Sequence, residues 1–286
     1  MDEVPLETRE LRYFVAVAEE LHFGRAAERL GMAQPPLSRA IQRLERRLGV
    51  RLLARDRRGV ALTDAGRTLL HEGRAALEAT LAAGRRARRA GAEGGAGERL
   101  VLAVKAGAFH ELLRKLLAAH AAEPGSAEVE VVPSGVCEQE EMLRDGRADV
   151  ALLHVPPRSL AGFDSERLST EGQVAVLPAG HPLAARASLS MAEVGAVPDL
   201  PLARWPGRDG FPPGPGPEIH DQTQLAQLIA LGRAAAVFPE SATSWLWSAH
   251  AAVPLVDAPE VAGHLAWPAH SRSRALAALV RTATRL

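Results

Sequence analysis

The most regular pattern of apolar and polar residues lies between positions 33 and 48. Apolar residues recur there at spacings of four, three and four, the period of one helix face, at Leu37, Ile41, Leu44 and Leu48. The positions between them are mostly polar or cationic, so the pattern predicts a helix with an apolar back and a positively charged front. Pro35 and Pro36 suit its first turn, where a missing amide hydrogen costs little. A narrow, cationic helix end of this kind can enter a DNA groove.

Two shorter helices and a hairpin are predicted around this helix. A helix over Thr8–Glu20 has Thr8 as its cap, and a second over 25–30 is closed by Gly31. Two apolar runs, 50–54 and 60–62, flank a cationic tip and predict a β-hairpin. Three small helices with a basic hairpin form a winged helix-turn-helix, whose third helix lies in the major groove.

A long helix is predicted to follow. Thr63 can cap it, and Leu70, Leu77 and Leu81 recur at spacings of seven and four, as in a two-stranded coiled coil. Residues 63–90 are therefore predicted to form a linker that dimerises the chain. The alternative is an amphipathic helix packed on its own domain. The glycine-rich run 91–97 predicts a hinge.

Residues 98–286 alternate short apolar runs with helical patterns, which predicts an α/β domain. We expect two lobes, the first made of 98–162 and 253–286 and the second of 163–252. Nine of the thirteen residues from Trp205 to Pro217 are Pro or Gly. Because no helix can form in such a run, the second lobe is expected to be shortened.

Several segments of the first 66 residues occur in an order that is typical of one protein family. They are Leu11-Arg12-Tyr13-Phe14, Phe23-Gly24-Arg25-Ala26-Ala27, Gln34-Pro35-Pro36-Leu37-Ser38-Arg39, Leu48-Gly49-Val50 and Leu62-Thr63-Asp64-Ala65-Gly66. In this order they resemble the DNA-binding domain of LysR-type transcriptional regulators. The resemblance implies a multidomain α/β chain: a winged helix-turn-helix over 1–62, a linker helix, and a two-lobed effector domain like periplasmic binding proteins.

The resemblance also implies which residues contact DNA, and the cationic front of the helix adds Gln42 and Arg43. The full set is Gln34, Pro35, Pro36, Ser38, Arg39, Gln42, Arg43, Arg55, Arg57 and Arg58. The chemistry agrees, since Arg can bond guanine O6 and N7 together and Gln can bond adenine N6 and N7. Arg46 and Arg47 are predicted to lie on a solvated face. The family usually has Ser or Thr where Ala33 stands, and losing that helix cap is expected to cost about 1 kcal/mol.

A small-molecule site between the lobes is implied in the same way. It comprises Lys105, Ala106, Gly107, Ala108, Arg204 and Trp205. The stretch 105–108 lacks the hydroxyl that the family usually has there. Lys105 would help the following helix N-terminus to bind an anion, Arg204 would pair with a carboxylate, and Trp205 would lie against an aromatic ligand. The alternatives are a solvated strand end for Lys105 and ordinary packing for the other two.

Charge and composition narrow the function. Residues 1–90 hold 18 arginines against 12 acidic residues, whereas the remainder is net acidic, as expected of one DNA-binding end. No signal region or membrane span is predicted, and Cys137 is the only cysteine, so we expect a cytoplasmic protein. Cys137 is either an inert thiol or a redox sensor. Scattered histidines and the lack of a nucleophile motif predict no enzyme, metal site or cofactor.

The leading hypothesis is a transcriptional regulator that binds an interrupted palindrome in double-stranded DNA. It would act as a dimer or, by the resemblance, a homotetramer, and a carboxylate or aromatic small molecule would change its promoter activity. RNA polymerase is a further candidate partner. A second hypothesis is a regulator with a degenerate effector domain that acts through abundance or a protein partner. A third is a small-molecule-binding protein whose DNA-binding head has lost its role.

Overall fold

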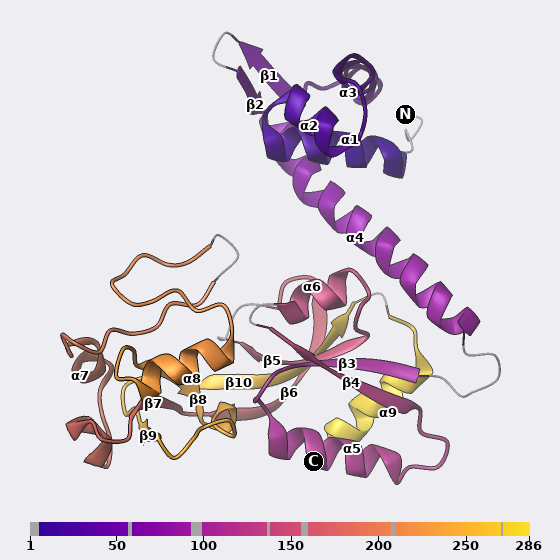
Figure 1. The fold of residues 1–286 in the computed structure, drawn as a ribbon. Coiled ribbons are helices and arrows are strands. Elements are labelled where there is room, and N and C mark those ends of the chain that lie inside the picture. Colours follow the sequence, from indigo (N-terminus) through magenta and orange to yellow (C-terminus); the bar gives the residue numbers. More distant parts are fainter. Residues whose placement is uncertain are drawn as a thin grey trace. The chain divides into compact units, whose positions relative to one another are not determined.

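The fold is described by a computed structural model (Figure 1). It describes residues 6–56, 59–92, 99–135, 138–155, 160–206, 210–269 and 271–286. Contacts divide the chain into two compact units, one covering residues up to Arg89 and the other most of the residues from Ala90 onward. Within the described ranges, no helix combines the length and the apolar character needed to cross a membrane.

The first unit is a three-helix bundle followed by a hairpin (Figure 1). Its helices enclose a core that includes Phe14, Leu37 and Ile41. The two hairpin strands pair antiparallel, with Leu53 opposite Leu62. The elements are α1 (Thr8–Glu20), α2 (Phe23–Arg29), α3 (Gln34–Leu48), β1 (Leu53–Asp56) and β2 (Gly59–Leu62). This order confirms the winged helix-turn-helix fold.

Local details of this unit differ from the predictions. The cap of α1 is Glu7 rather than Thr8, because Glu7 and Glu10 form a reciprocal capping box. The hairpin begins later than residue 50. The backbone amides of Leu52 and Leu53 instead donate to Glu45 Oε1, at 2.8 and 3.0 Å, which ties the start of β1 to α3.

The linker region is one long helix, α4 (Asp64–Ala92). Its first turn is capped as predicted, since the Gly66 amide donates to Thr63 Oγ1 at 3.0 Å. Leu70 packs partly against the core of the first unit, whereas Leu81 is 56% exposed. Most of the predicted hinge, 93–97, lies outside the described residues. Dimerisation through Leu70, Leu77 and Leu81 therefore stays a prediction.

The second unit contains two sheets. The first has the strand order β4-β3-β5-β10-β6, in which β3 pairs parallel with β4 and β5, and β10 pairs antiparallel with β5 and β6. The second is antiparallel, with the order β8-β7-β9. The elements are β3 (Arg99–Lys105), α5 (His110–Ala121), β4 (Glu128–Ser134), α6 (Glu138–Arg144), β5 (Val150–Val155), β6 (Phe163–Glu171), β7 (Gln173–Pro178), η1 (Pro182–Ala185), α7 (Met191–Gly195), α8 (Gln222–Ala230), β8 (Ala236–Pro239), η2 (Glu240–Ala242), β9 (His250–Pro254), β10 (Val261–Pro268) and α9 (Arg274–Ala283).

Helices cover both faces of the first sheet, with α5 and α9 on one side and α6 on the other (Figure 1). Strand β3 explains this arrangement. Leu100 and Leu102 join the core under α5 and α9, whereas Val101 and Ala103 join the core under α6. Because successive strand residues point to opposite faces, its continuous apolar run fits a strand buried on both sides.

The predicted lobe boundaries at 163 and 253 are wrong. Strand β6 belongs to the first sheet, where Trp267 of β10 lies opposite Asp164. The chain therefore passes to the second sheet after Glu171 and returns before Val261. Strand β6 is a polar edge strand, so its apolar pattern is too weak to assign it to a sheet from the sequence.

Candidate functional site

The polar side of α3 is open to solvent. Leu37, Ala40, Ile41 and Leu44 are buried and hold the helix to the core. Of the predicted DNA-contacting residues on this helix, Pro36 and Ser38 are half-buried and the others are exposed: Gln34, Pro35, Arg39, Gln42 and Arg43. The helix therefore presents two arginines and two glutamines on one exposed side.

The N-terminus of α3 explains why Ala33 is tolerated. Ala33 is the N-cap, with φ −76° and ψ 149°. A capping side chain accepts a bond from the amide two or three positions further on, and those positions are Pro35 and Pro36. Neither proline has an amide hydrogen, so a serine at position 33 would find no donor there. The expected loss of about 1 kcal/mol is therefore wrong for this chain.

Arg46 and Arg47 are both exposed, as predicted, and each also bonds to the protein. Arg47 Nη2 forms an ion pair with Glu10 of α1, and Arg46 Nε donates to the Gln42 carbonyl at 3.4 Å. Arg47 stays exposed to solvent, as the pattern predicts, and also joins α3 to α1.

Arg57 and Arg58 lie outside the described residues, and so does the side chain of Arg55, whose backbone belongs to β1.

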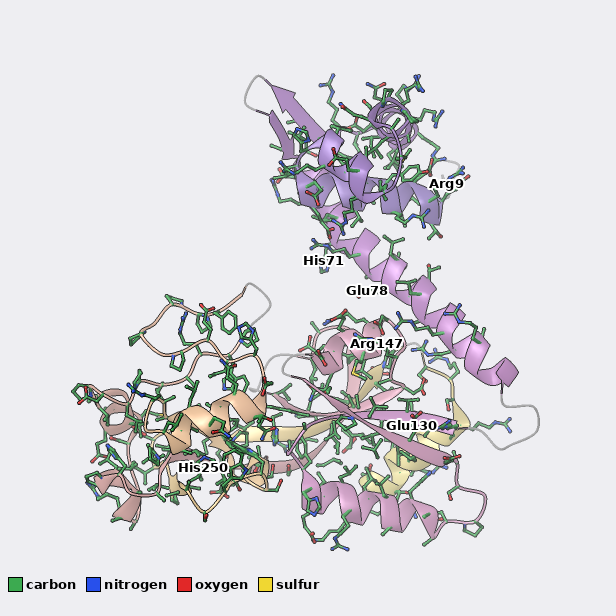
Figure 2. The ribbon with its side chains drawn as sticks, viewed as in Figure 1. Arg9, His71, Glu78, Glu130, Arg147 and His250 are labelled. Atoms are coloured by element: carbon green, nitrogen blue, oxygen red, sulfur yellow. The ribbon has the colours of Figure 1, made fainter. Side chains whose placement is uncertain are left out.

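Arg9 is a cation near this face that the sequence pattern did not indicate. It projects from the first turn of α1 (Figure 2) and lines the same surface hollow as Pro36 and Arg43. Nothing in the sequence links position 9 to position 43, because only the packing of α1 on α3 brings them together. Arg9 therefore adds a cation beside α3, in a hollow that Glu7 and Glu10 also line.

In the second unit, Lys105 and Trp205, two residues of the predicted effector site, lie close together. Lys105 Nζ lies 5.0 Å from the centroid of the Trp205 ring and 5.1 Å from that of Phe238. These distances are within the range of cation–π attraction. Trp205 and Phe238 lie edge to face, with centroids 6.0 Å apart. Phe238 belongs to β8, and its short apolar run in the sequence indicates a strand but gives no sign of a ligand site.

The turn from Ala106 to Ala108 is covered by side chains from the other lobe. Ser244 Oγ donates to the Gly107 carbonyl at 3.0 Å. The Gln222 amide, oriented so that both its atoms are bonded, donates to the Ala106 carbonyl at 2.6 Å and accepts from Trp245 Nε1 at 2.6 Å. Gln222, Ser244 and Trp245 were not predicted. Ser244 and Gln222 bind the carbonyls of the turn directly, and Trp245 bonds to Gln222.

Arg204 has a role that the sequence did not predict. Its guanidinium donates to the carbonyls of Pro212 and Gly216, both at 2.7 Å, and to Glu218 Oε1 at 3.0 Å. These bonds hold the Pro- and Gly-rich loop, in which the described residues form no helix. These three bonds give Arg204 a role in holding the loop, and its role in ligand binding stays a prediction.

A polar cluster lies behind the same turn. Phe109 stacks on His154 of β5 with ring centroids 3.8 Å apart. His154 Nε2 lies 3.0 Å from both Glu171 Oε1 and Ser241 Oγ. Burial raises the pKa of the Glu171 carboxyl, but the hydrogen bonds from His154 and Ser241 outweigh it and lower its pKa below the ordinary value. The cluster links β5 and β6 of the first sheet to η2, which follows β8 of the second.

Two family profiles match the chain. The profile described as "Bacterial regulatory helix-turn-helix protein, lysR family" matches residues 8–67, and that of the "LysR substrate binding domain" matches residues 93–286. The chain belongs to the LysR family. It is therefore a DNA-binding transcriptional regulator with an effector-binding domain.

Named LysR relatives and solved LysR structures agree with this assignment. The HTH-type transcriptional regulator AlsR of Bacillus subtilis is 33% identical over 249 residues, which cover 83% of this chain and 82% of AlsR. IlvR of Caulobacter vibrioides is 33% identical over 299 residues and covers 98% of each chain. The crystal structure of CbnR, a LysR family transcriptional regulator, has a TM-score of 0.57 at 27% identity, covering 98% of this chain and 99% of CbnR. These relatives are named as regulators, not enzymes.

Proposed function

We propose that the exposed face of α3 recognises a specific DNA sequence. The observation that supports this most directly is that Gln34, Arg39, Gln42 and Arg43 are exposed while the opposite side of the helix is buried. Gln34 and Arg39, nearest the helix N-terminus, contact base edges. A bidentate base contact of this kind contributes about 1–3 kcal/mol of discrimination.

Other residues of the interface fix the position of the protein on the duplex. Pro35, Pro36, Ser38, Gln42 and Arg43 lie against the sugar-phosphate edges beside the bases. Arg55, Arg57 and Arg58 of the wing, together with Arg9, add phosphate contacts. Such contacts set register without selecting sequence. Arg58→Ala should accordingly weaken binding to all sequences alike and reduce the salt slope by about 1.

The assembly that we propose is a dimer through Leu70, Leu77 and Leu81 of α4, and a tetramer through the effector domains. CbnR has been solved in complex with its target DNA, at 28% identity and a TM-score of 0.52 to this chain. A two-fold dimer requires a palindromic site with a fixed spacing between half-sites. RNA polymerase is the proposed partner at the promoter, and chromosomal DNA as target implies a cytoplasmic location.

The proposed effector is a small carboxylate with a flat or apolar body, bound beside residues 105–108 and Trp205. Lys105 supplies a positive charge there, and Trp205 and Phe238 supply aromatic walls. A ligand that enters must displace the bonds from Gln222 and Ser244 to the turn. Binding would therefore shift the lobes between two arrangements and change the DNA-bound form.

The test is DNase footprinting of the full chain on the DNA upstream of its own gene. A panel of aromatic and aliphatic carboxylates is added in turn. We expect a protected interrupted palindrome that shortens with one class of compound. Protection that no compound changes would contradict the effector proposal and favour action through abundance or a protein partner. No protection at low salt would contradict the DNA-binding proposal.

A further inference from the structure

Helix α4 is attached to the first unit at its beginning. Gly66 lies so close to the preceding strand segment that an added Cβ would be 2.1 Å from the Leu52 carbonyl oxygen. Leu69 and Leu70 pack against the core of the unit. The first turns of α4 are therefore fixed to the base of the hairpin.

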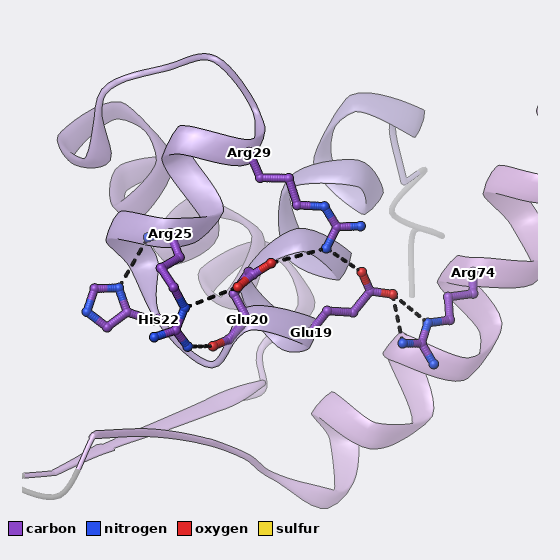
Figure 3. A network of polar contacts seen from close by, with 6 residues as sticks. All are labelled: Glu19, Glu20, His22, Arg25, Arg29 and Arg74. Carbon is purple, nitrogen blue, oxygen red and sulfur yellow. Dashed lines mark hydrogen bonds and ion pairs between the residues drawn. The ribbon is translucent and has the colours of Figure 1, made fainter. Parts of the chain in front are cut away.

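A second attachment lies further along α4. A Cβ added to Gly73 would contact Leu11 and Val15 of α1, at 3.4 and 3.5 Å. The next residue, Arg74, donates from Nε to Glu19 Oε1 at 2.8 Å, and its Nη2 lies 2.7 Å from the same oxygen (Figure 3). The small glycine lets the helices approach, and the arginine beside it binds the end of α1.

Glu19 also binds α2, so that it connects three helices. Its other carboxylate oxygen, Oε2, lies 2.7 Å from Arg29 Nη1 (Figure 3). Burial raises the pKa of the Glu19 carboxyl, but the hydrogen bonds from Arg74 and Arg29 outweigh it and lower the pKa below its ordinary value. A carboxylate with two guanidinium partners is a stronger connection than an isolated surface pair.

The neighbouring carboxylate, Glu20, makes no such connection to the described side chains of α4. Glu20 Oε2 pairs with Arg25 Nε at 3.2 Å, and Glu20 Oε1 lies 3.6 Å from Arg29 Nη1 (Figure 3). Arg25 and Arg29 both belong to α2. Glu20 is therefore a matched control for Glu19, since it has the same charge, helix and type of partner but does not touch the linker.

Two separated attachments define the direction of a helix. Arg74 lies ten residues beyond Asp64, or about 15 Å along α4. If the contact at Arg74 is lost, α4 can pivot about the fixed contacts near Gly66. Helix α3 is bound to α1 through the core and through the Glu10–Arg47 ion pair. The contact at Arg74 consequently fixes the direction of α4 relative to the helix that faces DNA.

We propose that Glu19 and Arg74 are positioning residues that determine which half-site spacing the regulator selects. The inference rests on the proposed function, in which two copies dimerise through α4 on an interrupted palindrome. One added base pair moves a half-site by about 3.4 Å and rotates it by about 35°. A linker of fixed direction accommodates one spacing and rejects its neighbours, whereas a pivoting linker accommodates several.

The experiment measures binding of the full chain to duplexes that differ only in spacer length. A duplex selected from a random pool by the wild-type protein supplies the two half-sites. Dissociation constants are measured for that spacer, for spacers one base pair shorter and longer, and for a single half-site. The variants are Arg74→Met, which keeps the aliphatic stem, Glu19→Gln, and the control Glu20→Gln.

We expect Arg74→Met and Glu19→Gln to reduce the preference for the selected spacer by about two- to fivefold, as for the loss of a surface ion pair. Binding to the single half-site should stay within about twofold of wild type, and Glu20→Gln should keep the wild-type preference. An unchanged spacer preference in both variants would overturn the inference. An equal loss of affinity for the selected duplex and for the single half-site would also overturn it. A wild-type protein that prefers no spacer would instead contradict the proposed dimer on a palindrome.

Discussion

Restoring the hydroxyl that the family usually has before α3 should not stabilise this chain. Ala33 is exposed and has the backbone conformation of an N-cap, with φ −76° and ψ 149°, so Ala33→Ser introduces no strain. The hydroxyl would have to accept from Pro35 or Pro36, which have no amide hydrogen. We therefore expect a change within about 0.5 kcal/mol, as for an ordinary surface substitution.

The same substitution should become stabilising once a donor is restored. Pro36→Ala returns the amide at the third position of the helix, and Ala33→Ser in that background should then gain about 1 kcal/mol. The coupling between the two sites, measured by a double-mutant cycle, is therefore also about 1 kcal/mol. This value is worked from positions 33 and 36 alone.

Amide hydrogen exchange of the full chain, followed by mass spectrometry on peptides from 34–48, measures this effect where it arises. About 1 kcal/mol corresponds to roughly fivefold slower exchange through local opening. We expect that slowing for Ala33→Ser only in the Pro36→Ala background. Equal slowing in both backgrounds, or in neither, would refute the reasoning about the missing amides.

Three further predictions concern buried or half-buried positions. The four tryptophans, which all lie beyond residue 200, report on the two positions in the second unit, His120 and Glu171. His120 is 2% exposed, and neither ring nitrogen has a hydrogen-bond partner among the described residues. His120→Leu should therefore raise the free energy of unfolding of the second unit, measured in urea, by about 1–3 kcal/mol. A lower free energy of unfolding would contradict this prediction. The pKa of Glu171 in the folded chain lies below its ordinary value of 4.5. The ionised carboxylate therefore stabilises the fold above pH 4.5, and this stabilisation is lost as the pH falls through the folded-state pKa. The stability difference between wild type and Glu171→Gln should shrink on acidification below that value, and a difference that grows would oppose the assignment. Gly66→Ala places a Cβ against the Leu52 carbonyl and should lower stability by about 1–3 kcal/mol. The expected result is faster amide hydrogen exchange in residues 64–74. Unchanged exchange there would contradict the prediction, because it would show that the site relaxes around the added Cβ.

The sequence predicts the first unit well because its signals are local. The spacing of Leu37, Ile41 and Leu44 defines the buried side of α3, and Thr63 caps α4 as expected. The parallel strands of the first sheet are also predictable, since their apolar runs are nearly continuous. These patterns depend on neighbours within one element, which a sequence shows directly.

The features that the sequence does not predict depend on contacts between distant segments. The partners of β6 cannot be known from its own polar pattern, because β10 lies about a hundred residues away. Arg204 binds loop carbonyls up to 12 residues away, and no local signal distinguishes that role from ligand binding. Gln222 and Ser244 reach the Ala106–Gly107 turn only because the two sheets fold together.

The most direct test of the central claim, that the exposed face of α3 recognises DNA sequence, is a comparison of Arg39→Ala with wild type. Dissociation constants are measured at fixed salt for a selected duplex, for its single-base variants and for random DNA. Arg46→Ala is the matched control, since among the described residues its guanidinium bonds the backbone of its own helix, at the Gln42 carbonyl. We predict that Arg39→Ala loses about 5- to 150-fold on the selected duplex, relaxes preference at one base pair and leaves binding to random DNA nearly unchanged. An undiminished preference at every base pair would contradict the claim.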